Sequence, residues 1–404
     1  MADFYQVGVI STLHQLDTAG PARLEAELER YARSRPIALV IPALYSEFEG
    51  PALPRILETL SSIRYLRRVV VSLDAASQAQ FALARRAVAA ISTAEASVIW
   101  HDGLGLQDLY RMLRDQHLLQ AECGKGRACW MSAGYVLACG DCDVIAMHDA
   151  DITTYDREVL ARLCYPIAHP ALGYEFCKGY YPRVSEGRMY GRATRLLMTP
   201  LLRSLYKIVG YLPILVYLDS FRYILSGEVA MVTDLARVVR TPSDWGLEVG
   251  TLAEVYRNTS TQRVCQVGLT SRYDHKHQDL SSDDQSTGLF RMGIDICLSI
   301  LRTLASEGVT LSTGTLNTLV GTYLRTAEDT IKRFHDDAAI NGLHFDRQAE
   351  EVAVETFTKG IRIASRQYLE TTPDRPLIPN WNRVVSAIPD FFDRLKTAIE
   401  ADNR

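Results

Sequence analysis

Short apolar runs alternate with amphipathic stretches through the first half of the chain. Four runs predict buried strands, at residues 37–41, 69–73, 97–100 and 143–147. Apolar residues at helical spacing predict helices at residues 21–34, 53–63, 77–91, 106–119 and 127–138. Strands that are apolar throughout and separated by helices are typical of a mainly parallel sheet covered on both faces.

Polar residues follow each of the four predicted strands. They are Glu47, Asp74, Asp102 and the pair Asp149 and Asp151. Ligands of parallel α/β sheets bind outside the carboxyl ends of the strands. We therefore expect these side chains to meet at one edge of the sheet.

The pattern becomes more helical toward the C-terminus. A strand is expected at residues 173–178, and an apolar run lies at 264–269. Helices are expected at 193–209, 291–306, 316–336 and 348–366. The expected fold class is α/β, a mainly parallel sheet followed by a helical C-terminal region. We divide the chain into an N-terminal helical segment (1–35), a sheet domain (36–285) and the helical region (286–404).

The composition is that of an ordinary globular enzyme, since 47% of the 404 residues are apolar and 23% are charged. A formal net charge of −4 gives no overall positive field, so nucleic acid is not an expected partner. The apolar stretch at residues 209–218 contains Pro213 and is shorter than the roughly 20 residues of a membrane span. We expect a buried element or a dimer contact there.

The N-terminus and the cysteines predict a compartment. The first fifteen residues lack the basic region, apolar core and cleavage site of a secretory signal. The eight cysteines show no disulfide spacing, and Cys139 and Cys142 have no second pair to complete a zinc site. A reducing cytoplasm is therefore expected.

Asp149 and Asp151 are the first candidates for chemistry. Two carboxylates one residue apart, at the exit of a buried strand, suit one hard divalent cation that also binds phosphates. The alternative is that they are surface residues capping the next helix. Their place at a strand end gives the two interpretations about equal weight.

Lys125 lies between Gly124 and Gly126, directly before a predicted helix. Glycines let a backbone approach a phosphate closely, lysine supplies a compact cation, and a helix N-terminus favours an anion. Taken alone, these three residues are more often a simple turn.

Two later clusters add candidates. His275 and His277 are close in sequence, and one of them could complete a cation's ligand set; the alternative is an exposed polar loop. Glu248 follows Trp245 and Gly246, which suits the binding of sugar hydroxyls, although a capped helix explains the run equally well.

The order of the motifs resembles a known family. The series is Pro-Ala-Leu-Tyr-Ser-Glu-Phe-Glu at 42–49, Gly-Lys-Gly at 124–126, Asp-Ala-Asp at 149–151, Lys-Gly-Tyr-Tyr-Pro-Arg at 178–183, Gly-Arg-Ala-Thr at 191–194, Leu-Ser-Gly-Glu at 225–228, Asp-Trp-Gly-Leu-Glu-Val-Gly at 244–250 and Asp-His-Lys-His at 274–277. It is similar to the retaining glycosyltransferases that make glucosyl-3-phosphoglycerate, with mannosylglycerate synthase as a more distant relative. The resemblance covers about residues 36 to 300, and no motif ties the last hundred residues to it.

The resemblance implies a GT-A fold, a homodimer and a Mg²⁺ or Mn²⁺ ion. Donor-binding roles fall on Pro42, Ala43, Leu44, Glu47, Asp74, Lys125 and Asp149. Metal-binding roles fall on Asp151 and His275, and acceptor-binding roles on Gly191, Arg192, Thr194 and His277. Glu248 would hold the donor sugar's hydroxyls, and Leu225 would present its carbonyl near the anomeric carbon.

Three positions depart from the family pattern. Tyr45 and Ser46 stand where Asn-Glu is common, and Asp74 is followed by Ala75 rather than the glycine of an Asp-Gly-Ser turn. An asparagine is common at the position of His277. The uracil contact of Asp74, the acceptor preference and the division of roles between the two histidines therefore stay open.

The implied reaction moves glucose from UDP-glucose to 3-phosphoglycerate with retention of anomeric configuration. Mannose transfer from GDP-mannose to glycerate or phosphoglycerate, or use of another small acceptor, is the alternative. A sugar-nucleotide pyrophosphorylase is disfavoured because residues 42–47 lack the glycine-rich loop of that class. A non-catalytic sugar-nucleotide-binding protein is disfavoured because Lys125, Asp149, Asp151, Glu248 and His275 are all intact.

Overall fold

A mainly parallel sheet forms the centre of the fold in a computed structural model that describes residues 6, 8–16, 20–120, 123–271, 273–274, 288–370 and 377–404. Within these residues eight strands follow the order β1-β10-β6-β9-β5-β2-β3-β4, with β9 antiparallel to both neighbours. They are β1 (Ser11–Leu13), β2 (Ile37–Leu44), β3 (Leu66–Asp74), β4 (Glu95–Trp100), β5 (Val144–Met147), β6 (Phe176–Tyr180), β9 (Val229–Val232) and β10 (Val264–Gly268). A separate hairpin pairs β7 (Val184–Ser185) with β8 (Arg188–Met189).

The expected strands are all present, and the fold class is confirmed. Successive residues of a strand face opposite sides of a sheet, so Leu39 enters one hydrophobic core and Val40 the other. Both faces are buried, which explains why the runs are apolar throughout. The sequence pattern does not predict β1 or β9, because three or four residues carry too little periodicity.

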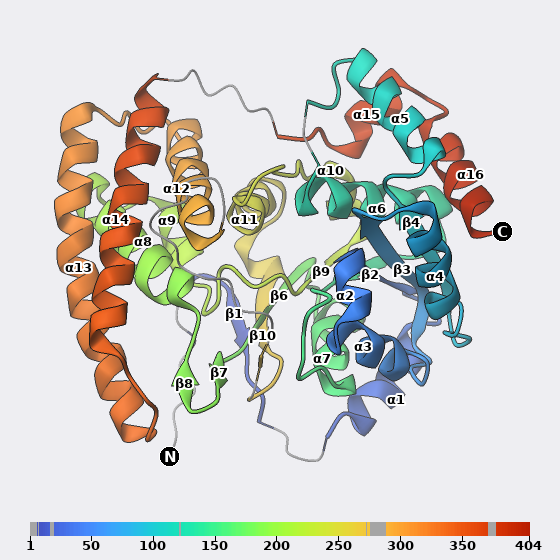
Figure 1. The fold of residues 1–404 in the computed structure, drawn as a ribbon, viewed down its shortest axis with the longest axis horizontal. Helices are drawn as coiled ribbons and strands as arrows, with labels where there is room; N and C mark the ends of the chain where they lie inside the picture. The colour runs from blue at the N-terminus through green and yellow to red at the C-terminus, as the bar shows by residue number, and fades with distance from the viewer. Residues whose placement is uncertain are drawn as a thin grey trace.

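Helices cover both faces of the sheet (Figure 1). One core contains α1 (Ala22–Tyr31), α3 (Ala52–Leu60), α4 (Gln78–Val88) and α7 (Arg157–Ala168). The other contains α5 (Leu104–Asp115), α6 (Lys125–Cys139), α10 (Thr233–Val238) and α11 (Leu247–Asn258). The short helix α2 (Tyr45–Glu49) directly follows β2.

A helical bundle lies beside the sheet, at the left of Figure 1. It contains α8 (Thr199–Val209), α9 (Pro213–Asp219), α12 (Gly288–Ser306), α13 (Thr313–Ile340) and α14 (Arg347–Glu370). The helix expected at 193–209 opens as a π-helix, Ala193–Met198, before it continues as α8. The apolar stretch at 209–218 becomes α9, whose Ile214, Leu215, Tyr217 and Leu218 are buried.

The end of the chain returns to the sheet. The helices α15 (Trp381–Ala387) and α16 (Phe391–Asn403) pack on α6 and on the edge strand β4, at the right of Figure 1. The Asn403 side chain accepts a hydrogen bond from the Val98 amide at 2.9 Å and donates one to the Val98 carbonyl at 2.8 Å. These bonds pair backbone groups that an edge strand would otherwise expose.

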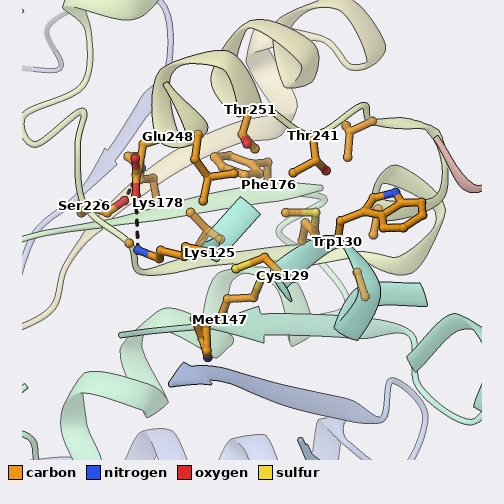
Figure 2. Close-up of a pocket in the computed structure, with 18 of the residues that line it drawn as sticks. Lys125, Cys129, Trp130, Met147, Phe176, Lys178, Ser226, Thr241, Glu248 and Thr251 are labelled. Atoms are coloured by element: carbon orange, nitrogen blue, oxygen red, sulfur yellow. Dashed lines mark hydrogen bonds and ion pairs between the residues drawn. The ribbon is translucent and has the colours of Figure 1, made fainter. Parts of the chain in front are cut away.

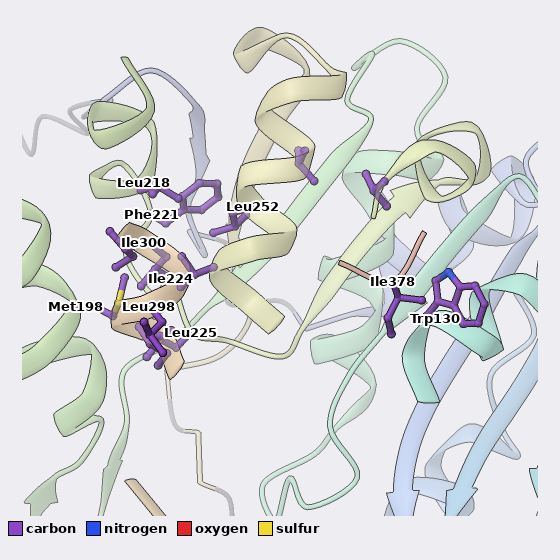
Figure 3. Close-up of a cluster of buried hydrophobic side chains, with 14 of the residues drawn as sticks. Trp130, Met198, Leu218, Phe221, Ile224, Leu225, Leu252, Leu298, Ile300 and Ile378 are labelled. Carbon is purple, nitrogen blue, oxygen red and sulfur yellow. The ribbon is translucent and has the colours of Figure 1, made fainter. Parts of the chain in front are cut away.

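The bundle and the sheet share one hydrophobic core. Figure 3 shows part of it, with Leu225 lying near Leu298 and Met198 and with Trp130 on the side of the sheet. The proposed division into three parts stays a prediction; β1, from the first part, pairs with β10 of the second. Within the described residues, no helix is both long and apolar enough to cross a membrane.

Candidate active site

A cleft of about 1170 Å³ opens at the carboxyl ends of β2, β3 and β5. Most of the residues expected to form a site line it: Pro42, Ala43, Leu44, Glu47, Asp74, Lys125, Asp149, Asp151, Gly191, Arg192, Leu225 and Glu248. Thr194 is buried in the π-helix and is not part of this lining. His275 and His277 lie outside the described residues.

Lys125 connects three of the motifs. Its Nζ lies 2.7 Å from Oδ1 of Asp149 and 3.3 Å from Oε1 of Glu248, as Figure 2 shows for Glu248. Burial alone would lower the pKa of Lys125, but the two carboxylates hold it well above its ordinary value. One ammonium group therefore links β5, α6 and α11.

Close packing at the start of α6 explains why residue 126 is a glycine. The helix begins at Lys125, and a Cβ on Gly126 would lie 2.1 Å from the carbonyl oxygen of Pro242. Gly126 therefore serves close packing against the loop that precedes α11. The first backbone amides of α6 have no partner within the helix and favour an anion nearby.

Asp149 packs closely against the Leu-Ser-Gly-Glu turn. A Cβ on Gly227 would lie 2.5 Å from Oδ1 of Asp149, so no side chain fits between them. Leu225 lies two residues earlier, and its side chain is buried in the shared core while the residue lines the cleft. The turn and the end of β5 are thus brought together as the resemblance implies.

A buried lysine that has no role in the sequence-based interpretation holds this turn. Lys178 in β6 is 1% exposed and donates a hydrogen bond to the Ser226 carbonyl at 2.6 Å. The Ser226 hydroxyl in turn donates to the Gly179 carbonyl at 2.6 Å. Burial lowers the pKa of Lys178 to about 8, although Glu248 and Glu228 oppose the shift.

Figure 2 shows Lys125, Lys178, Ser226 and Glu248 at one end of a small cavity of about 70 Å³. Phe176 lies in the middle of the view, and Trp130 and Thr241 lie at the other end. The cavity extends the cleft beneath Glu248. It therefore belongs to the same site.

Glu228 ends the turn and is fully buried. Tyr181 donates a hydrogen bond to its Oε2 at 2.6 Å, and Tyr273 donates one to its Oε1 at 2.5 Å. The two tyrosine rings stack with their centroids 3.4 Å apart. These contacts fix Tyr273, the residue before Asp274, against the Leu-Ser-Gly-Glu turn.

Asp274 lies near the acidic strand end. The Thr153 amide donates to the Asp274 carbonyl at 2.9 Å, and the Asp274 amide donates to the Thr154 hydroxyl at 3.1 Å. Thr153 comes two residues after Asp151 in the chain. Within the described residues, no three side chains of His, Cys, Asp or Glu form a metal-binding group. The carboxylate of Asp151 suits Mg²⁺ or Mn²⁺ by its oxygen chemistry.

The residues at the ends of β2 and β3 form a different part of the cleft. The last three residues of β2 are Pro42, Ala43 and Leu44, and Asp74 is the last residue of the neighbouring β3. Burial raises the pKa of Asp74, while Arg127, whose Nη2 is 3.9 Å from Oδ2, opposes the shift.

Basic side chains gather in another part of the cleft. They are Arg183, Arg188, Arg192, Arg291 and His344. Gly191 has a φ of +78°, a conformation that glycine adopts without strain, and it turns the chain into the π-helix. The last two of these basic residues come from the helical region, where the sequence offers no motif to indicate them.

The chain is similar over its full length to proteins of known function. No family model matches the sequence. The chain is 47% identical over 403 residues to glucosyl-3-phosphoglycerate synthase of Persephonella marina, covering 100% of this chain and 99% of the relative. It is 38% identical over 404 residues to the enzyme of the same name from Methanococcoides burtonii, covering 99% and 98%.

Solved structures show the same fold. Glucosyl-3-phosphoglycerate synthase of Mycobacterium tuberculosis in complex with Mn²⁺, UDP and glucosyl-3-phosphoglycerate matches with a TM-score of 0.53, at 20% identity, over 73% of this chain and 87% of that one. The complex of the same enzyme with Mn²⁺, UDP-glucose and phosphoglyceric acid matches equally well, with a TM-score of 0.53 at 21% identity. The fold is therefore GT-A, and the full-length similarity to the curated relatives shows that the chain belongs to the glucosyl-3-phosphoglycerate synthase family of glycosyltransferases.

Proposed function

We propose that this chain transfers glucose from UDP-glucose to 3-phosphoglycerate, with retention of anomeric configuration, and releases UDP. The observation that carries this proposal is the position of Lys125 between Asp149 and Glu248, in a cleft whose other part is basic. A sugar donor needs hydroxyl and phosphate contacts, and a phosphorylated acid needs cations. The cleft offers both.

The donor would lie along the carboxyl ends of β2, β3 and β5. Pro42, Ala43, Leu44 and Glu47 would frame the uridine, with Asp74 near the base. Lys125 would lie near the uracil and the phosphates, and Asp149 would contact the ribose or the diphosphate. The support for these roles is that all seven residues line one continuous cleft.

A Mg²⁺ or Mn²⁺ ion would be held by Asp151 and His275 together with diphosphate oxygens of the donor. His275 directly follows Asp274, whose backbone is hydrogen-bonded to Thr153 and Thr154, and these follow Asp151 closely in the chain. When bound, such an ion neutralises the charge that develops on the leaving diphosphate. The oxygen and imidazole donor set fits either metal.

The chain's own groups would orient the sugar and the acceptor. Glu248 would accept hydrogen bonds from the glucose hydroxyls, and the Leu225 carbonyl would face the anomeric carbon. The acceptor hydroxyl attacks that carbon from the face that the diphosphate leaves. The bond to UDP breaks, the new glycosidic bond forms, and the proton passes to a phosphate oxygen of the leaving UDP.

The acceptor would bind at the basic part of the cleft. Gly191 and Arg192 would meet its carboxylate and phosphate, with Thr194 and His277 completing the contacts. Arginine suits planar carboxylate and phosphate groups because it donates two parallel hydrogen bonds. Thr194 is buried beside this surface, so its contribution would come from the first turn of the π-helix.

A donor-by-acceptor matrix tests the proposal. Purified protein with Mg²⁺ or Mn²⁺ is given UDP-glucose or GDP-mannose, each with 3-phosphoglycerate, D-glycerate or no acceptor. We expect nucleotide release to require UDP-glucose and 3-phosphoglycerate together, and proton NMR to show an α-linked product. Preferred turnover of GDP-mannose would favour the mannosyl alternative, and a β-linked product would overturn retention.

We further propose a cytoplasmic homodimer. All eight cysteines are free in the structure, as expected in a reducing compartment. The dimer follows from the family resemblance alone. Light scattering coupled to gel filtration should give about twice the 45.2 kDa chain mass, and a monomeric mass would contradict it.

A further inference from the structure

The helical region contributes directly to the basic part of the cleft. Its lining residues are Leu289, Arg291, Met292 and Asp295 from α12, His344, Phe345 and Asp346 before α14, and Ala349 and Glu350 within α14. One of them, Glu350, contacts a residue proposed to bind the acceptor. Through this contact the C-terminal helical region touches the proposed acceptor-binding site.

Glu350 is a buried carboxylate shared by two arginines. It is 3% exposed. Its Oε1 accepts a hydrogen bond from Nε of Arg192 at 2.9 Å, and its Oε2 accepts one from Nη1 of Arg195 at 2.7 Å. Two cations and one anion leave one net positive charge at this edge of the cleft.

Arg195 has enough partners to be a structural residue. Its Nε donates to the Tyr190 carbonyl at 2.9 Å, and its guanidinium lies 4.8 Å from the centre of the Phe334 ring. The Glu350 carboxylate neutralises this buried cation. Nη2 of Arg195 also donates to Oε1 of Glu350 at 3.3 Å, so Arg195 contacts both carboxylate oxygens.

Oε1 of Glu350 also accepts the shorter hydrogen bond from Nε of Arg192, which holds this guanidinium at one edge. Arg192 is the residue before the π-helix, and its side chain is 35% exposed. Among the described residues only its Nε has a hydrogen-bond partner, which leaves both terminal nitrogens available. A guanidinium fixed at Nε presents those nitrogens in one orientation, as paired recognition of a carboxylate or phosphate requires.

The backbone around Glu350 is also fixed to the acceptor side. The His344 amide donates to the Gly187 carbonyl at 2.8 Å, and His344 forms a bridge with Arg188 of β8. This ties the turn between α13 and α14 to the hairpin that leads to Arg192. The segments that carry the Glu350 carboxylate and the Arg192 guanidinium are therefore hydrogen-bonded to each other.

We propose that Glu350 is a positioning residue that orients the Arg192 guanidinium toward an anionic group of the acceptor, an inference that rests on the proposed function. The helical region thereby determines acceptor affinity. The proposed donor contacts, Lys125, Asp149 and Glu248, come from other elements: the end of β5, α6 and α11.

Steady-state kinetics of Glu350→Gln test the proposal. Glutamine keeps the shape but loses the charge and one acceptor oxygen, so Arg192 regains rotational freedom. We expect the KM for 3-phosphoglycerate to rise about tenfold or more, while kcat and the KM for UDP-glucose stay within about twofold. If Glu350 had a purely structural role, its replacement would lower the melting temperature without raising the KM for 3-phosphoglycerate relative to the KM for UDP-glucose.

Glu351→Gln is the matched control. Glu351 is the next residue of α14, pairs with Arg347 at 2.8 Å on an exposed face, and has no contact with the cleft. All its constants should stay within about twofold of wild type. If folded Glu350→Gln keeps the wild-type acceptor KM, Glu350 does not position Arg192.

A double-mutant cycle separates an effect through Arg192 from a general one. Arg192→Ala leaves the Glu350–Arg195 pair intact and should raise the acceptor KM by a smaller factor in the Glu350→Gln background than in wild type. Equal factors would overturn the proposal. Should Glu350→Gln not fold, Glu350→Asp keeps the charge beside Arg195 but is too short to reach both arginines, and the same cycle applies.

The failure of the proposed function would look different. In that case wild-type protein would show no release of UDP that depends on 3-phosphoglycerate. Calorimetric titration of 3-phosphoglycerate in the presence of UDP and Mn²⁺ would then still compare wild type with Glu350→Gln. Equal affinities there would overturn the positioning role independently.

Discussion

Lys125 places one positive charge against two carboxylates from different elements. Without it, Asp149 and Glu248 would face the donor as unneutralised negative charges beside a diphosphate. We expect Lys125→Met to lower kcat/KM for UDP-glucose by about 100-fold, a loss typical of one preorganised charged donor. Initial rates of UDP release measure it.

Lys332→Met is a suitable control, because Lys332 is exposed on α13. It should leave kcat/KM unchanged. A loss smaller than about threefold in Lys125→Met would show that Lys125 does not act on the donor.

Lys178 predicts a pH dependence of stability. Burial and the nearby Lys125 lower its pKa to about 8 from an ordinary value of 10.5, against the opposing charges of Glu248, Glu228 and Asp149. Between about pH 8 and 10.5 the unfolded chain binds a proton that the folded chain does not. The free energy of unfolding of wild type should therefore rise with pH relative to Lys178→Met.

Urea denaturation at pH 7.5, 8.5 and 9.5 measures this difference. Lys396→Met, on an exposed part of α16, should track wild type at all three values. A constant gap between wild type and Lys178→Met across the series would contradict the shifted pKa. Lys178→Met should also slow transfer, because the Ser226 carbonyl loses its donor and the turn at Leu225 loosens.

At the scale of elements, α6 depends on the returning C-terminus. A Cβ on Gly134 would lie 2.1 Å from Cζ2 of Trp381, whose indole is fully buried and stacks on Trp130 at 4.1 Å. We expect Gly134→Ala to lower the free energy of unfolding by about 1–3 kcal/mol, as overpacked cores do.

Gly321→Ala gives the matched control in α13. Nothing lies within 4 Å of a Cβ built there, so alanine should raise stability by up to about 1 kcal/mol through its helix propensity. Thermal unfolding of both variants decides the outcome. Similar melting temperatures for the two would show that the contact of α6 with Trp381 is not tight.

At the scale of the molecule, the cleft joins the sheet and the helical bundle. A ligand that binds only the folded state stabilises it by mass action, by about 2.7 kcal/mol at 100 times its dissociation constant. We expect UDP with Mn²⁺ to raise the melting temperature of wild type and EDTA to reverse the rise. EDTA should also abolish transfer.

Asp151→Ala is the informative variant for this experiment, since Asp151 is a proposed metal ligand. It should show no turnover at saturating metal and a much smaller rise in melting temperature with Mn²⁺. Undiminished turnover of Asp151→Ala would refute its assignment. Full stabilisation by UDP after EDTA treatment would show that the donor binds without a metal.

The longer strands, most helices and the family could be predicted from the sequence, whereas the short strands β1 and β9 could not. Apolar runs such as the one around Val40 are visible without coordinates, because burial on both faces imposes its own pattern. The polar residues at the strand ends, Asp149 and Asp151 among them, followed from the same topology. Lys125 and Glu248 required the order of motifs.

Only the tertiary structure decided which distant residues meet. In the sequence, Lys178 begins a motif of the family resemblance but receives no role, and Glu350 is one acidic residue of a long helix. Their roles arise from contacts with Ser226, 48 residues away, and with Arg192, 158 residues away. Local hydrophobic periodicity predicts which residues are buried. It does not predict which distant residues contact each other, because those contacts depend on how the whole core packs.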